Sequence, residues 1–288
     1  MGYVLALASA ALYGAADFLG GMASRTVNTI ATVVVSQAAG LLLLVTFLPF
    51  LPAAATRSDF VWGGASGLAG GIGVGLLYRA LAIGTMAIVA PTTAVCAVLI
   101  PVAAETIAGE RLGGRTIAGI VLALVAIVLV SQAPPSPVGR AVSGAPRERD
   151  NVRATSMWLA IASGVAIGFF FLALARTDAA AGLWPLVAAR AVSVSLFLGL
   201  AVAHRQSLRM AARPLAIVVT CGIVDMAANA LYILATRRGA LSAIVTLASL
   251  YPASTVLLAR VVLRERLSRR QALGIVSALV AVALIVST

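Results

Sequence analysis

The chain has 288 residues, of which 61% are hydrophobic and 10% are charged. A soluble domain cannot cover that much apolar surface, so the composition excludes an ordinary water-soluble protein and indicates one whose solvent is lipid. The net charge of +12 could suggest a nucleic-acid-binding protein. However, the arginines lie between apolar segments, and no basic stripe or nucleic-acid motif occurs, so nucleic acid is not an expected partner.

Ten apolar segments follow one another along the chain, each close to the length that spans a bilayer. A helix satisfies its own backbone hydrogen bonds, so each segment is predicted to be a transmembrane helix. The prediction is an all-α integral membrane protein whose short connections pack neighbouring helices up and down. The segments are roughly residues 3–23, 29–51, 60–80, 85–107, 114–132, 156–176, 183–203, 214–236, 240–262 and 269–287.

One stretch of sequence occurs twice. Residues 110–129 read ERLGGRTIAGIVLALVAIVL and residues 265–284 read ERLSRRQALGIVSALVAVAL, which are identical at 12 of 20 positions. The offset is about half the chain, which indicates a duplicated architecture. Two five-helix repeats are predicted, over residues 1–132 and 156–288, joined by a flexible linker over residues 133–155 that is rich in Pro, Gly and Arg.

An odd number of helices in each repeat has a topological consequence. The second repeat must enter the bilayer from the opposite face, which makes the two halves an inverted repeat. Inverted repeats are typical of secondary transporters, which hold their substrate near the midplane between the halves. We call the side that bears both termini side A and the opposite side, side B. The loops of side A hold 6 arginines and those of side B hold 13, so the positive-inside rule places side B in the cytoplasm and both termini outside.

The third predicted helix carries glycine at every fourth position, at Gly63, Gly67, Gly71 and Gly75. Such a ridge of small residues lets a neighbouring helix approach closely, so a packing role is predicted for it. The two cysteines, Cys96 and Cys221, are solitary within apolar segments and are expected to be packing residues.

The loop before the last helix of each half carries a shared motif. It reads Gly-Glu-Arg-Leu at residues 109–112 and Arg-Glu-Arg-Leu at residues 264–267. Together with Tyr78, Tyr232 and Tyr251-Pro252, this motif resembles that of the EamA-type transporters of the drug/metabolite transporter superfamily. The resemblance covers nearly the whole chain. It implies a cell-membrane exporter of small metabolites, such as amino acids and related compounds, commonly driven by the proton gradient.

Two features depart from the family pattern. The family often has an arginine in the second and seventh helices; here the seventh has Arg190, but the second has Ser36-Gln37. Family members generally have cytoplasmic termini, opposite to the charge count, so the side of the termini stays open. The glutamates of the motif, Glu110 and Glu265, are expected to cap helix starts and to pair with nearby arginines.

Five ionisable side chains lie within the predicted helices, where a charge is costly and is a functional candidate by default. They are Asp17, Glu105, Arg190, Asp225 and Arg260. By depth, Glu105 and Arg190 lie toward side A, while Asp17 and Arg260 lie toward side B. We expect Glu105–Arg190 and Asp17–Arg260 ion pairs that close the two ends in turn as gates. The alternative is that Glu105 and Arg260 only reach to the membrane interface.

Polar residues also share faces of two predicted helices. Asp225, Asn229 and Tyr232 are spaced i, i+4 and i+7, and Tyr13 and Asp17 are spaced i and i+4. A polar stripe in lipid must face a cavity or a partner helix. The functional interpretation is a substrate cavity, with Asp225 binding a cationic group or carrying the coupled proton. The alternative is a structural hydrogen-bond cluster.

Tyr251, beside the helix-loosening Pro252, is a further candidate cavity residue. The sequence holds no nucleotide-binding loop, catalytic motif or metal-ligand spacing, so neither an enzyme nor a cofactor is predicted.

The leading hypothesis is a secondary active exporter of small amino-acid-like or amine-like metabolites. It would work by alternating access in the cell membrane, with protons as the candidate coupling ion. The expected partners are a small-molecule substrate and the lipid bilayer, with the protein as a monomer or weak homodimer. A channel, a membrane-embedded enzyme and a lipid-handling protein are the alternatives.

Overall fold

The computed structural model describes residues 1–48, 54–107, 113–131, 146–236, 238, 248, 250–265 and 269–286. These residues form α-helices and one short 3-10 helix, with no strand among them, so the all-α prediction is confirmed. In chain order the elements are α1 (Gly2–Ala23), α2 (Thr29–Phe47), α3 (Arg57–Ile83), α4 (Met86–Ile107), α5 (Gly114–Ser131), α7 (Pro146–Leu174), η2 (Ala179–Ala181), α8 (Trp184–Ala203), α9 (Ala212–Thr236), α11 (Tyr251–Val262) and α12 (Arg269–Val286).

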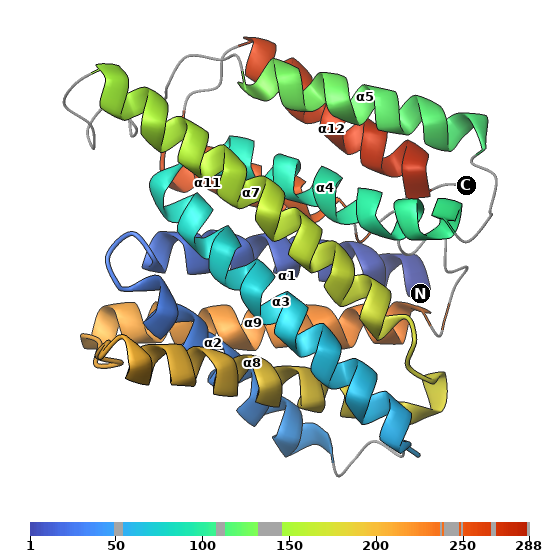
Figure 1. The fold of residues 1–288 in the computed structure, drawn as a ribbon, viewed down its shortest axis with the longest axis vertical. Helices are drawn as coiled ribbons and strands as arrows, with labels where there is room; N and C mark the ends of the chain where they lie inside the picture. The colour runs from blue at the N-terminus through green and yellow to red at the C-terminus, as the bar shows by residue number, and fades with distance from the viewer. Residues whose placement is uncertain are drawn as a thin grey trace.

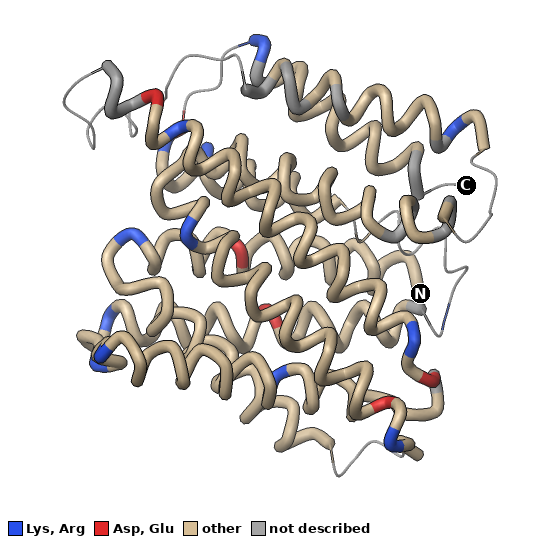
Figure 2. The backbone as a smooth tube through the Cα atoms, in the orientation of Figure 1, with Lys and Arg blue, Asp and Glu red and all other residues tan. Residues whose placement is uncertain are grey.

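The helices have the length and the surface of membrane spans. Within the described residues, α1, α2, α3, α7, α8 and α9 are long and apolar enough to cross a bilayer, and shorter apolar stretches lie in α4, α11 and α12. Large apolar side chains such as Leu42 and Val261 point outward and are 71% and 67% exposed. Charged residues gather mainly at the two ends of the bundle (Figure 2). The start of α1 and the end of α12 lie on the same side, which is side A (Figure 1).

Two predicted boundaries differ from the structure. Residues 146–155, predicted to be flexible linker, are the first turns of α7. They are polar and lack an apolar period, but a proline at the first helical position is pre-organised for a helix start. The predicted helix over residues 240–262 is seen as α11 from Tyr251 onward, and residues 240–247 lie outside the described ones.

The helices of the two halves pack against one another in matched pairs (Figure 1). The first five helices, α1 to α5, correspond in order to α7, α8, α9, α11 and α12. Exchanging each helix for its counterpart turns the α1–α9 contact into α7–α3, α2–α9 into α8–α3, and α1–α11 into α7–α4. The α5–α12 and α2–α8 contacts are their own counterparts. These contacts are therefore symmetric under exchange of the halves, whereas the α4–α12 contact has no counterpart of similar size among the described residues.

One hydrogen bond repeats this symmetry at the level of single atoms. The Ser9 hydroxyl of α1 donates to the carbonyl oxygen of Ala228 on α9 over 2.8 Å. At the equivalent place, the Ser163 hydroxyl of α7 donates to the carbonyl oxygen of Gly73 on α3, also over 2.8 Å. Both bonds need the two helix backbones to lie close together, which small residues permit.

The predicted glycine ridge is confirmed, because each of its residues lies against α8: Gly63, Gly67, Gly71 and Gly75. A Cβ added to Gly67 would stand 2.2 Å from the carbonyl oxygen of Ala189. Helices α9 and α2 approach each other as closely, because a Cβ on Gly222 would stand 1.9 Å from the carbonyl oxygen of Ser36. These helices touch backbone to backbone, so neither site has room for a methyl group.

At side B, a buried carboxylate joins the two halves. Glu265 follows α11 and is 2% exposed. Its carboxylate accepts hydrogen bonds from the N–H groups of Met86 and Ala87, over 3.3 and 3.2 Å, at the start of α4. The Arg25 guanidinium lies 3.6 Å away, and we call Arg25 and Glu265 the side-B latch. Glu265 was predicted to cap the helix that follows it and to pair with nearby arginines. In the structure it instead caps α4, in the other half, and pairs with Arg25.

Arg25 extends the latch to a third segment, because it also donates to the carbonyl oxygens of Leu81 and Gly84 at the end of α3. Burial raises the pKa of the Glu265 carboxyl, against the hydrogen bonds from α4 and the charge of Arg25, which lower it. The N–H groups of α4 and, after them, Arg25 thus favour the charged form of this buried carboxylate. Glu110, its counterpart in the first repeat, lies outside the described residues.

The close approaches predict an uneven response to alanine. Gly67→Ala and Gly222→Ala should each lower the free energy of unfolding by about 1–3 kcal/mol, the usual cost of overpacking. Gly199→Ala on α8 is the control, because nothing lies within 4 Å of its added Cβ. Equilibrium unfolding in mixed SDS micelles measures all three, and equal losses at Gly199 and Gly67 would contradict the packing described.

The latch predicts a pH-dependent cost for Arg25→Gln. Once the pH exceeds the raised pKa of Glu265, the wild-type carboxylate is charged, and removing the arginine strands it. Below that pKa the carboxyl is protonated, so the same change costs less. The expected loss at about pH 8 is roughly 1–3 kcal/mol and should shrink toward about pH 5. Arg79→Gln, an exposed arginine in the same part of the chain, should show no such trend; a pH-independent cost for Arg25→Gln would contradict the latch.

Candidate functional site

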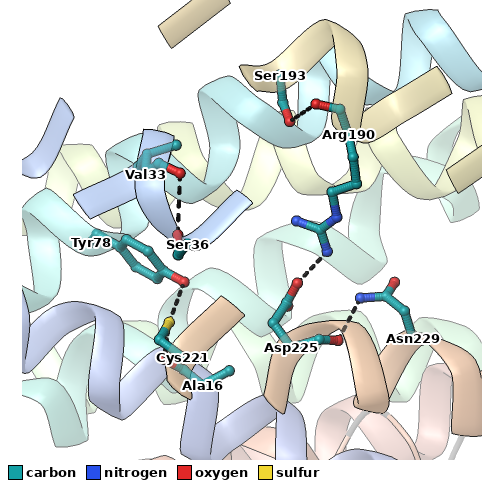
Figure 3. A network of polar contacts seen from close by, with 9 residues as sticks. All are labelled: Ala16, Val33, Ser36, Tyr78, Arg190, Ser193, Cys221, Asp225 and Asn229. Atoms are coloured by element: carbon teal, nitrogen blue, oxygen red, sulfur yellow. Dashed lines mark hydrogen bonds and ion pairs between the residues drawn. The ribbon is translucent and has the colours of Figure 1, made fainter. Parts of the chain in front are cut away.

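An ion pair lies inside the bundle, between Arg190 of α8 and Asp225 of α9 (Figure 3). The side chains are 12% and 20% exposed, and Asp225 stands midway along its helix. A lone charge at this depth would be costly, so each group is held in place by neutralising the other. Two hydrogen bonds to the backbone lie next to the pair. The Ser193 hydroxyl donates to the backbone carbonyl oxygen of Arg190 over 3.2 Å, and the Asn229 side-chain amide donates to that of Asp225 over 2.8 Å.

Among the described residues, the ion pair of Arg190 differs from the predicted gate pair, and the Glu105 half of that prediction is untested. Arg190 contacts Asp225 rather than Glu105, whose side chain lies outside the described residues. Arg260 is exposed on α11, and the ion pairs found among the described residues do not include it or Asp17. Depth along a helix orders charges from end to end, but it does not say which helix faces meet. The exposure of Arg260 fits the interfacial alternative.

Several of the predicted cavity residues gather beside the ion pair. The rings of Tyr13 on α1 and Tyr251 on α11 meet edge to face, with centroids 6.4 Å apart and planes at 64°. Asp17 is close enough to Tyr13, Tyr251 and Asp225 to interact with each electrostatically. Tyr13 is also within electrostatic range of Tyr232 and Arg190. We call Tyr13, Asp17, Tyr232 and Tyr251 the tyrosine–aspartate cluster.

A second polar chain crosses the bundle from α3 to α1 through α9. The Tyr78 hydroxyl lies 3.1 Å from the Cys221 sulfur, and the thiol donates to the carbonyl oxygen of Ala16 over 3.3 Å (Figure 3). Tyr78 and Cys221 are 3% and 0% exposed. Cys221 packs as predicted, but its hydrogen bonds were not foreseen, since no local spacing in the sequence signals contacts between residues so far apart.

The second helix offers amide and hydroxyl groups where the family pattern often has arginine. Ser36 donates to the carbonyl oxygen of Val33 over 3.2 Å. Gln37 is 4% exposed, and within the described structure its carbonyl oxygen Oε1 has no hydrogen-bond partner. Helix α2 packs against both α8, which carries Arg190, and α9, which carries Asp225. The unpaired oxygen of Gln37 therefore lies on a helix next to the ion pair.

The ion pair predicts a non-additive double-mutant cycle. Asp225→Asn and Arg190→Gln should each lower the free energy of unfolding by about 3 kcal/mol, because each strands a buried charge. The double variant should cost less than the sum, since it strands neither. Unfolding in mixed SDS micelles gives the three values, with the exposed Asp150→Asn as the control for a simple loss of charge. Additive losses would show that the two groups are independent.

Comparison with known proteins places the chain in a family. The model of the EamA-like transporter family matches residues 1–132 and, separately, residues 154–287. A search of curated proteins finds no match. One solved structure, described only as the crystal structure of a protein, superposes with a TM-score of 0.60 at 19% identity and covers 98% of this chain and 96% of its own. Such a likeness shows the fold alone. Because the family model covers nearly the whole chain, once in each half, the protein belongs to the EamA-like transporter family and is a multi-pass membrane transporter.

Proposed function

We propose that this transporter is a secondary active exporter of small amino-acid-like or amine-like metabolites, working by alternating access in the cell membrane. The observation that carries the proposal is the meeting of ionisable and aromatic side chains between the two halves. Tyr13 and Asp17 come from the first half, while Arg190, Asp225 and Tyr251 come from the second. A site shared by two halves changes its access when one half moves against the other.

The proposal includes an inverted repeat over residues 1–132 and 156–288. The symmetric helix pairs and the matched bonds from Ser9 and Ser163 support two equivalent halves. Five helices in each half then require opposite orientations in the bilayer. The side-B latch joins loops of both halves, so opening at that end involves separating Arg25 from Glu265.

The charges within the span support a carrier of polar compounds. The Arg190–Asp225 pair can exchange its internal contact for the carboxylate and ammonium groups of a substrate at little net cost in charge. Asp17 and Asp225 are the carboxylates available to carry a coupled proton, which would link export to the proton gradient. A channel instead requires a continuous polar pore. Arg260 is exposed at one end of α11, so its charge does not extend the internal polar groups into such a pore.

The proposal predicts that cells overexpressing the wild-type chain export at least one compound from a panel of amino acids and amines. Asp225→Asn at equal expression should reduce that export about tenfold or more, the factor that corresponds to roughly 1.4 kcal/mol of lost interaction. The Arg190→Gln/Asp225→Asn double variant separates stability from transport, because it should fold better than either single variant and still not export. Asp150→Asn, exposed near the start of α7, should export normally.

Counterflow in liposomes tests the carrier mechanism directly. A carrier shows accelerated uptake of labelled compound when unlabelled compound is inside, whereas a channel does not. Export without this trans-stimulation would favour the channel. Unchanged export by both Asp225 variants would mean that the ion pair is structural.

A further inference from the structure

The tyrosine–aspartate cluster has polar groups that the protein itself does not use. In the part of the chain that the structure describes, the Asp17 carboxylate makes neither an ion pair nor a hydrogen bond. The hydroxyls of Tyr13, Tyr232 and Tyr251 likewise make no hydrogen bond there. All four side chains are partly, not fully, buried. Four neighbouring polar groups that have no partner within the described part of the protein, and whose polar atoms are not sealed off, are available to a ligand.

Among Arg190, Asp225 and Asp17, Asp17 is the acidic group without an ion-pair partner in the described structure. Arg190 and Asp225 neutralise each other through direct contact. Asp17 lies within electrostatic range of Asp225, and no cation among the described residues pairs with it. With Asp17 ionised, two carboxylates against one guanidinium give the region a net charge of −1, which attracts a cation and repels an anion. A cation bound there in turn stabilises the ionised form of Asp17.

The rings of the cluster suit a cation as well. Tyr13 and Tyr251 are inclined at 64°, so they form a corner, and each keeps a ring face that the other does not cover. The negative face of an aromatic ring attracts ammonium groups, most strongly where water is excluded. Asp17 follows Tyr13 by one helical turn on the same face of α1, so its carboxylate stands beside this corner.

We propose that Tyr13, Asp17 and Tyr251 form a binding site for the ammonium group of an organic cation. This inference rests on the proposed transport function and narrows the substrate to amines. An amine has no carboxylate to draw Arg190 away, so Arg190 and Asp225 remain paired here and border the site, and the unused acceptor of Gln37 belongs to the adjoining helix α2. A neutral compound of the same shape gains nothing from Asp17, and an anionic one is repelled.

The test is calorimetric binding to the purified full-length protein in detergent, which does not depend on transport. The probes are benzyltrimethylammonium, benzyl alcohol and benzoate, which share one ring and differ in charge. Only the cation should bind measurably. Asp17→Asn should weaken its binding about tenfold or more, while the exposed Asp150→Asn should leave it unchanged.

The tyrosines give a second and milder test, which holds even if Asp17→Asn folds poorly. Tyr251→Leu removes the ring face and should weaken binding of the cation several-fold. Tyr251→Phe keeps the ring face and should weaken it less. Equal binding of benzyl alcohol and the cation, or full affinity in folded Asp17→Asn, would overturn the ammonium site.

Failure of the site and failure of the transport proposal give different results. Counterflow of some metabolite without binding of benzyltrimethylammonium would refute the ammonium site and keep the exporter. Binding that depends on Asp17 and Tyr251, without counterflow of any amine, would keep the site and refute the exporter.

Discussion

Lipid offers no hydrogen bonds and little screening of charge. An ionised group inside the bundle is therefore stable only when a partner of opposite charge, from the protein or from a ligand, lies beside it. Arg190 and Asp225 form such a pair, which requires α8 and α9 to turn these two side chains toward each other inside the bundle. The other polar groups near this pair differ in whether they have a partner within the protein. Tyr78 contacts the Cys221 sulfur, while Asp17 pairs with no cation in the described part of the chain. The difference separates a polar contact that completes the fold from a group that is left for a ligand.

Small residues make the rest of this arrangement possible. Where Gly67 meets Ala189, the backbones touch, and hydroxyl groups such as those of Ser9 and Ser163 can then reach carbonyl oxygens of the facing helix. Packing between helices in lipid cannot rely on the hydrophobic effect, so close contact and interhelical hydrogen bonds replace it. The same bond is donated once from each half to the other, so the two halves share a way of joining their helices.

The sequence was sufficient for whatever depends on one helix at a time. Long apolar segments predicted the helices, the spacing of Gly63 to Gly75 predicted a packing ridge, and the spacing of Tyr13 and Asp17 predicted a shared face. Contacts between helices were predicted poorly, because they depend on how each helix is rotated and how deep it sits. The pairing of Arg190 with Asp225 was missed for this reason. Glu265 was expected to act locally, yet it caps α4 from the opposite half. The start of α7 was missed because its first turns are polar.

The contact between Gly222 and Ser36 has a mechanical consequence. Two helices that touch through their backbones cannot be pressed closer, and separating them would open a gap that lipid tails fill badly. They can still tilt about the point of contact. In the alternating access proposed above, the crossing of α2 with α9, one helix from each half, would be the fulcrum: displacement at one end of the bundle would be balanced by an opposite displacement at the other. In such a lever the two ends would not both be wide open, and this exclusion would follow from the absence of a single side chain, at Gly222.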